Sequence, residues 1–244
     1  MTQDQTPEYS TNQQVVLSVS ESAFKGQGGK IPPEKVFDHM VLFGPCARAI
    51  GHARAAVELQ RSGFEGEGVA LVRAAFEYAV TAQWAYFNAG GVDRLFATAR
   101  ADHVRTWRQL GARAGISDQV EARFRDTTWG KELPRFADIL RSVDPDGFYG
   151  EQYSLLSKFS HVSGDMIAAH VAVSDEGMML RPHTYDQYPQ VTGLIMAGSA
   201  LMAAWLLEDL REDVDRRKCV EKISDDHLIP CWITEPPDWR GWTP

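Results

Sequence analysis

Apolar side chains recur at helical spacing through long stretches of this chain, and this periodicity constrains the fold more than any other feature. Between residues 67 and 88 the large apolar side chains lie three or four positions apart: Val69, Val72, Phe76, Val80 and Trp84. Such spacing places them on one face of an α-helix. The stretch is also rich in alanine, which favours helix and close packing. We therefore expect a helix over 67–88 with one face in a hydrophobic core.

Glycine and proline residues divide the rest of the chain into further segments of this kind. We expect helices over 34–61, 92–112, 117–126, 134–143, 148–169 and 188–218. Pro45 is expected to split or bend the first of these, because proline removes a hydrogen bond inside a helix. Two short apolar runs around a turn predict a small β-hairpin near 171–180, and Val15–Val19 is expected to form a short strand.

These elements predict an all-α, single-domain helical bundle of about six to seven helices. The sequence shows no internal repeat and no linker. We divide it into a polar N-terminal segment (1–33), the bundle (34–222) and a strap rich in proline and tryptophan (223–244), whose tryptophans are expected to anchor it. The last helix is charged on nearly all sides past Glu208, so we expect its end to project into solvent or against a partner, which makes a homodimer one expectation.

The charge of the chain argues against nonspecific nucleic-acid binding, because its formal net charge is −8. The charge is uneven, since residues 91–141 hold ten Lys and Arg against seven Asp and Glu. Solvated helix faces with ordinary ion pairs are the simpler interpretation of this basic region, and nucleic acid is the alternative. The arginines concerned lie in the region 94–125: Arg94, Arg100, Arg105, Arg108, Arg113, Arg123 and Arg125.

Cysteine usage and the N-terminus predict a cytoplasmic protein. Cys46, Cys219 and Cys231 form no CxxC pair and no metal-ligand spacing, as expected of reduced thiols. The chain opens without the basic and apolar regions of a signal peptide. Its longest apolar run, near 194–207, is shorter than the roughly 20 residues of a membrane span. We expect this run to be a core helix, and we expect no membrane contact and no cofactor.

Two polar motifs lie within these apolar segments. Arg73 and Glu77 are four residues apart in the helix expected over 67–88. Polar groups also recur every fourth residue in the helix expected over 148–169: Tyr153, Ser157, His161 and Asp165. Each set therefore lines one helix face. Because charged groups on an apolar helix need partners, we expect the two sets to form one polar cluster between the helices.

Several enzyme classes fit these motifs poorly. A Ser-His-Asp set along one helix lacks the sharp turn and the oxyanion donors that acyl transfer needs. Potential metal ligands show neither HExxH nor ExxH spacing, so we expect no metal site. They are His52, Glu77, His161, Asp165 and His170.

The HEPN helical ribonucleases offer another comparison, through their Arg-x(4–6)-His signature. The pairs Arg48/His52 and Arg100/His103 have spacers that are too short. Arg73 can instead approach His161 across helices. In a metal-free ribonuclease the histidine would act as acid and base, while the arginine would stabilise the phosphorane.

The two motifs resemble a bacterial helical family known as domain of unknown function 5677. Residues 70–80 are similar to its "LLRSLLE" helix, and residues 153–161 to its "Y-x-x-LS-x-x-H" helix. The resemblance covers about residues 40–205 and implies an all-helical fold. It also implies that the signature positions are Arg73, Glu77, Ser157 and His161, and it brings no established reaction. Gly164-Asp165 stands where that family has a short break, so we expect the helix to continue here.

Three hypotheses follow for the function, and the sequence does not decide whether the protein is an enzyme. The first is an interhelical polar site, formed by Arg73 and Glu77 with Ser157 and His161, that binds a small ligand or has a regulatory role. The second is a HEPN-like, metal-independent ribonuclease of a defence or toxin–antitoxin system, with His161 and Arg73 as catalytic candidates. The third is a structural bundle that dimerises or binds a partner. A separation of more than about 10 Å between the two motifs would exclude a shared site.

Overall fold

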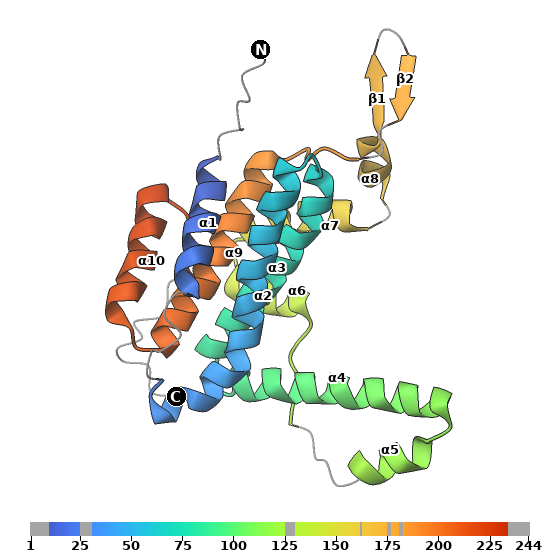
Figure 1. The fold of residues 1–244 in the computed structure, drawn as a ribbon, viewed down its shortest axis with the longest axis vertical. Coiled ribbons are helices and arrows are strands. Elements are labelled where there is room, and N and C mark those ends of the chain that lie inside the picture. Colours follow the sequence, from blue (N-terminus) through green and yellow to red (C-terminus); the bar gives the residue numbers. More distant parts are fainter. Residues whose placement is uncertain are drawn as a thin grey trace.

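The computed structural model of the chain describes residues 10–24, 31–124, 130–161, 163–174, 177–180 and 183–233. Within these ranges the fold is an all-α bundle with one two-stranded antiparallel hairpin, β1 (Val171–Ser174) and β2 (Gly177–Leu180) (Figure 1). A 3-10 turn at Pro33–Lys35 precedes the second helix. The all-helical class and the hairpin are therefore confirmed. The α-helices are α1 (Thr11–Ala23), α2 (Val36–Arg61), α3 (Glu65–Phe87), α4 (Gly91–Ala114), α5 (Ser117–Phe124), α6 (Phe136–Val143), α7 (Phe148–Ser160), α8 (Gly164–Ala169), α9 (Pro189–Leu210) and α10 (Val214–His227).

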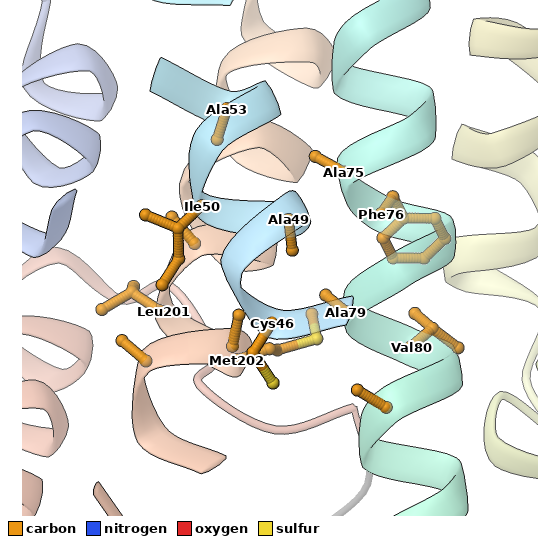
Figure 2. Close-up of a cluster of buried hydrophobic side chains, with 14 of the residues drawn as sticks. Cys46, Ala49, Ile50, Ala53, Ala75, Phe76, Ala79, Val80, Leu201 and Met202 are labelled. Atoms are coloured by element: carbon orange, nitrogen blue, oxygen red, sulfur yellow. The ribbon is translucent and has the colours of Figure 1, made fainter. Parts of the chain in front are cut away.

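The core lies where α2, α3 and α9 pack against one another. Small residues on the facing sides of α2 and α3 let these two helices approach closely, and α9 adds larger side chains (Figure 2). Helices α1 and α10 pack on α9, while α6 and α7 pack on α3. The buried side chains at this centre include Cys46, Ala49, Ile50, Ala53, Ala75, Phe76, Ala79, Val80, Leu201 and Met202.

Two parts of the chain project from this body (Figure 1). One is the arm formed by α4 and α5, and the other consists of α8 with the β-hairpin. Apolar side chains of the hairpin are exposed, among them Val173, Met178 and Leu180. The described residues hold ten α-helices rather than the expected six to seven, because α1, α8 and α10 were not expected as separate helices.

The N-terminal segment holds a helix where we expected a strand. Val15–Val19 lies within α1, whose start is fixed by reciprocal hydrogen bonds between Ser10 and Gln13. This capping box satisfies backbone N–H groups that the first helical turn leaves free. Val15, Val16 and Val19 are buried against the bundle, so α1 belongs to the core.

The second helix is continuous through Pro45, so of the two expected effects, a split or a bend, the split does not occur. Proline costs a helix one hydrogen bond and some steric strain. Ile50 and other buried residues of α2 lie beyond Pro45, and the burial of this face against α3 and α9 offsets that cost. Tertiary packing thus outweighs the local preference of the proline.

The last long helix is two helices, which corrects both its expected length and its expected exposure. Helix α9 ends at Leu210, Glu212 adopts a left-handed conformation, and Asp213 caps α10 by accepting the Arg216 N–H. Helix α10 therefore folds back along α9 instead of projecting. Glu208 and Asp209 are 2% exposed, so the charges beyond the apolar run are buried rather than solvated.

Helix α9 is long and apolar enough to cross a membrane by length and composition. However, 83% of its most apolar window is buried inside the bundle. Burial of this kind is what a core helix shows, as we expected for the apolar run at 194–207.

The C-terminal strap is described as far as Ile233. Its first part is still helix α10, and Trp232 then packs edge-on against Trp205 of α9, with ring centroids 5.7 Å apart. The buried Gln83 side chain of α3 also holds this segment, because it donates to the Cys231 carbonyl and accepts the Ile233 N–H. Trp239 and Trp242 lie outside the described residues.

The three thiols should differ sharply in reactivity. Burial raises the pKa of Cys46 and of Cys231 to about 12, whereas Cys219 is exposed. Since the thiolate is the reactive form, a thiol reagent at neutral pH should rapidly modify only the exposed Cys219 of the native protein. In denaturant it should modify all three. The Cys219→Ser variant should lose the rapid phase, and rapid modification of Cys46 in the native state would contradict the burial described above.

Candidate functional site

Helix α7 ends just before His161, so the expected helix over 148–169 is wrong. His161 has extended backbone angles, φ −126° and ψ 159°. The Ser163 hydroxyl then accepts the Met166 N–H and starts α8 as a separate helix. A serine that caps a new helix competes with continuation of the old one. The expected stripe from Tyr153 to Asp165 is therefore interrupted, and His161 lies at the point where the chain leaves the bundle.

Arg73 of α3 nevertheless meets His161 across the α3–α7 interface. Its Nη1 lies 3.0 Å from the imidazole Nε2. Its Nε and Nη2 both donate to the Tyr153 hydroxyl, at 3.3 Å and 2.9 Å. Its Nη2 also lies 3.0 Å from a carboxylate oxygen of Glu77, one turn further along α3. The separation that would exclude a shared site is thus not found.

The Tyr153 hydroxyl is the centre of this cluster. It accepts from Arg73 and donates to Glu77 Oε1 at 2.7 Å. The phenol ring packs against Phe136 and Phe76, with centroids 4.9 Å and 6.3 Å away. Burial and the hydrogen bond to Glu77 raise the pKa of Tyr153, and Arg73 opposes this only in part. The phenol therefore stays protonated at neutral pH and holds both charged groups in place.

Ser157 does not join these contacts in the way that we expected. The Ser157 hydroxyl donates to the Tyr153 carbonyl at 2.8 Å, within its own helix. Such a bond to the fourth preceding residue is a common way for serine to satisfy itself in a helix. The backbone of Asp165 lies in α8, and its side chain lies outside the described part of the structure. Among the side chains that the structure describes, the contacts join Arg73, Glu77, Tyr153 and His161, which we call the α3–α7 cluster.

The charge states within the α3–α7 cluster follow from its donors and acceptors. A guanidinium group can only donate, so His161 Nε2 must accept and carries no proton in this arrangement. Arg73 is balanced by Glu77, and their side chains are 21% and 37% exposed. His161 is exposed. The arrangement is therefore a neutralised ion pair with an imidazole at its open end, where a small solute can reach it.

Two large pockets among the described residues lie away from this cluster. Pockets of about 790 and 630 Å³ are lined by other residues, near the starts of α1 and α9 and between α1 and α2. Among the described residues, no three His, Cys, Asp or Glu side chains lie close enough to hold a metal ion.

The basic region 94–125 is engaged in contacts within the protein at several positions. Arg105 pairs with Asp102 and Glu132, and Arg108 pairs with Glu121. Arg94 donates to the Glu132 carbonyl and lies over the Trp84 ring. These contacts match the simpler interpretation of ordinary ion pairs on helix faces. Arg125 lies outside the described residues.

The sequence placed Tyr153 and Ser157 together on the helix face expected to meet Arg73. In the structure Tyr153 bonds to Arg73, whereas Ser157 does not. The spacing gives both residues the same face, yet only the longer side chain reaches across the interface while Ser157 bonds to its own backbone. The length of the side chain, rather than its spacing in the sequence, distinguishes Tyr153 from Ser157.

Comparison with known proteins assigns the chain to no family. No protein-family model, no curated protein and no solved structure matches the chain. The all-helical fold implied by the resemblance to domain of unknown function 5677 is present, while membership of that family has no support from a family match.

Proposed function

We propose that the α3–α7 cluster binds a small oxyanion and that its occupancy controls the segment that follows α7. The observation that carries this proposal is the 3.0 Å contact between Arg73 Nη1 and His161 Nε2 at an exposed edge. Two nitrogen groups that can both donate hydrogen bonds meet there. A phosphate or carboxylate oxygen is the natural acceptor for such a pair.

Binding requires only a small change at the imidazole. Without a ligand, His161 Nε2 accepts from Arg73. An incoming oxyanion would displace this contact, and the ring would take up a proton and donate to the anion. The imidazolium would also lie at the C-terminal end of α7, where the helix dipole favours positive charge. Arg73 would keep its contacts to Tyr153 and Glu77 through Nε and Nη2.

The position of His161 would allow binding of the oxyanion to affect α8 and the hairpin. It is the first residue after α7, and α8 and the hairpin come directly after it. Helix α8 packs on α7 and β1, and the hairpin projects from the body (Figure 1). A change in the contacts of His161 would therefore act on the element that follows it in the chain.

The resemblance to domain of unknown function 5677 agrees with part of this proposal. Arg73, Glu77 and His161, three of the four positions that it implies, are members of the cluster. The fourth, Ser157, supports the α7 backbone instead. Membership of that family, like the oxyanion site, is a proposal, and so are a cytoplasmic location and a homodimer.

Isothermal titration with inorganic phosphate tests the oxyanion site. We expect saturable binding to the unmodified protein and at least about tenfold weaker binding to His161→Ala. A hydrogen bond to a charged group is worth about 1.5–3 kcal/mol, which corresponds to tenfold or more. The matched control is Ser157→Ala, which removes a polar group of the same helix that does not face Arg73 and should bind phosphate normally.

Two other results would point to the alternatives. If phosphate does not bind and His161→Ala changes only stability, the cluster is a structural tie between helices. If the protein cleaves a labelled single-stranded RNA without metal, and His161→Ala abolishes the cleavage, the cluster serves a ribonuclease. The same Arg73–His161 contact underlies that second reading, since a histidine can exchange protons while an arginine stabilises the phosphorane.

A further inference from the structure

The arm formed by α4 and α5 projects from the body (Figure 1), and one side of α4 holds large apolar side chains in solvent. Another side of α4 is buried against α5, where Gly111 lies against Val120. On the open side, Trp107 is 44% exposed and Leu110 is 49% exposed. Apolar side chains that gather on an open surface in this way mark a place of interaction.

The side chains on this side follow the spacing of a coiled-coil seam. They lie alternately four and three positions apart along α4, and we call them the α4 seam: Phe96, Arg100, His103, Trp107, Leu110 and Ala114. Such spacing lets one helix pack lengthwise on another. The two polar members are held within the seam, because His103 Nε2 accepts from Trp107 Nε1 at 2.9 Å and the Arg100 guanidinium lies over the Phe96 ring.

The α4 seam continues onto the body at the base of the arm. Phe37 of α2 packs edge-on against Phe96, with ring centroids 5.4 Å apart. Val36 and Met40, in the first turns of α2, are both more than half exposed. A helix that lay along the seam and reached its base would therefore meet further apolar surface on α2.

The two ends of the α4 seam differ in charge. Asp93 and Asp38 lie near each other at the base, where burial and the Asp93 carboxylate raise the pKa of Asp38 and Lys35 opposes this in part. The tip instead carries the exposed Arg113, in the last turn of α4. Two such arms placed antiparallel bring each acidic base next to a basic tip, whereas a parallel arrangement brings like charges together.

We propose that the protein forms a homodimer in which the α4 seam packs antiparallel against the α4 seam of a second copy. Phe96 of each copy would then face Trp107 of the other, and Asp93 would lie near Arg113 of the other. His103 is midway between Asp93 and Arg113 in the chain, so the two-fold axis passes near it. Contacts that are the same on both copies close at two subunits.

The size of the surface bears on the strength of this dimer. The seam is about 27 Å long at 1.5 Å per residue and one helix, about 10 Å, in width. It is therefore smaller than the roughly 800 Å² that each partner buries in a stable interface. The exposed Val36 and Met40 enlarge it, because the tip of each arm reaches the base of the other. We expect a dimer that dissociates on dilution.

This interface differs from the one expected from the sequence and is independent of the oxyanion site. The end of the last expected helix folds back on α9 as α10, so it does not project toward a partner. The α4 seam shares no residue with the α3–α7 cluster. Failure of phosphate to bind would thus leave the dimer untouched, and a monomeric protein would leave the oxyanion site untouched.

Sedimentation velocity of the full chain over a hundredfold range of concentration tests the dimer. We expect a monomer–dimer equilibrium, which Leu110→Glu should weaken by at least about tenfold, because a carboxylate would be buried in the contact. The matched control is Gln109→Glu, which adds the same charge at the next exposed position of α4, outside the seam. It should dimerise as the unmodified protein does, and circular dichroism should show that both variants fold.

Charge reversal tests the antiparallel arrangement. Asp93→Arg and Arg113→Asp should each weaken the dimer, and the double variant should regain affinity because the pair is restored with opposite signs. In a Cys219→Ser background, His103→Cys should form a disulfide between copies on mild oxidation, whereas Gln109→Cys should not.

Three results would overturn the proposal. The first is a protein that stays monomeric at every concentration. The second is a Leu110→Glu variant that dimerises as well as Gln109→Glu. The third is equal crosslinking through positions 103 and 109, or a double charge variant that is weaker than both single variants.

Discussion

Replacing Phe76 by alanine should lower the free energy of unfolding by about 3–5 kcal/mol. Phe76 is fully buried on α3, and its ring contacts Phe136 of α6 and Tyr149 and Tyr153 of α7. The loss combines the transfer of a large apolar side chain to water with the cavity left behind. Because this ring joins three helices, we expect the cost to lie at the upper end of that range.

Chemical denaturation with urea measures this effect directly. Tyr78→Ala is the matched control, since Tyr78 is an aromatic residue two positions away on α3 and is 39% exposed. Its removal should cost about 1 kcal/mol or less. If the two variants lose similar stability, Phe76 does not hold α6 and α7 on α3 as described here. The Phe76→Ala variant should also bind phosphate more weakly, because Tyr153 would lose one face of its support.

Replacing Glu208 by alanine should also cost several kcal/mol, about 3–5 by analogy with other buried charge pairs that lose one partner. The Glu208 side chain is 2% exposed, and its Oε1 lies 3.2 Å from Arg211 Nη1 and 3.0 Å from Arg216 Nη2. These contacts cross the turn between α9 and α10. Alanine would leave both guanidinium groups without this acceptor. It would also weaken the packing of α10 against α9.

Glutamine at position 208 should be far less harmful than alanine. Burial raises the pKa of Glu208, and the attraction of Arg211 and Arg216 does not fully compensate. The carboxylate thus stabilises the fold as a hydrogen-bond acceptor more than as a charge, and Glu208→Gln keeps an acceptor. The exposed pair Lys222–Asp226 provides the control, because Asp226→Ala should leave stability almost unchanged.

The raised pKa of Glu208 also determines in which direction the stability of the fold changes with pH. A carboxyl group with a raised pKa in the folded state contributes stability that is fully present below its ordinary value of 4.5. This contribution is lost as the pH rises through the folded-state pKa. The unmodified protein should therefore lose stability relative to Glu208→Gln between pH 4.5 and neutrality. An opposite slope in paired urea titrations would mean that Arg211 and Arg216 outweigh burial.

The sequence predicted most of the helices because their apolar periodicity is strong. Helices α3, α4 and α6 lie within a few residues of their expected positions. The ends of the long expected helices were wrong for a physical reason. At His161 and at Glu212 a following side chain, Ser163 or Asp213, caps a new helix and turns the chain. Because the sequence on both sides of each break favours helix, composition alone does not reveal the break.

The polar features were harder to predict than the core. Periodicity placed Arg73 and His161 on facing helices, and the structure brings them together. It placed Tyr153 and Ser157 on the same face but could not show that only Tyr153 contacts Arg73. Glu208 and Asp209 look like solvated charges in the sequence, yet α10 returns to bury them.

The protonation of the His161 ring tests the central proposal most directly. Nitrogen-15 NMR of histidine-labelled protein distinguishes a ring nitrogen that accepts a hydrogen bond from one that donates. We predict that Nε2 of His161, assigned through the His161→Ala spectrum, is unprotonated in the free protein. On saturation with inorganic phosphate it should become a donor, and Ser157→Ala should behave in the same way. A His161 signal that phosphate leaves unchanged, or a protonated Nε2 in the free protein, would contradict the proposed oxyanion site.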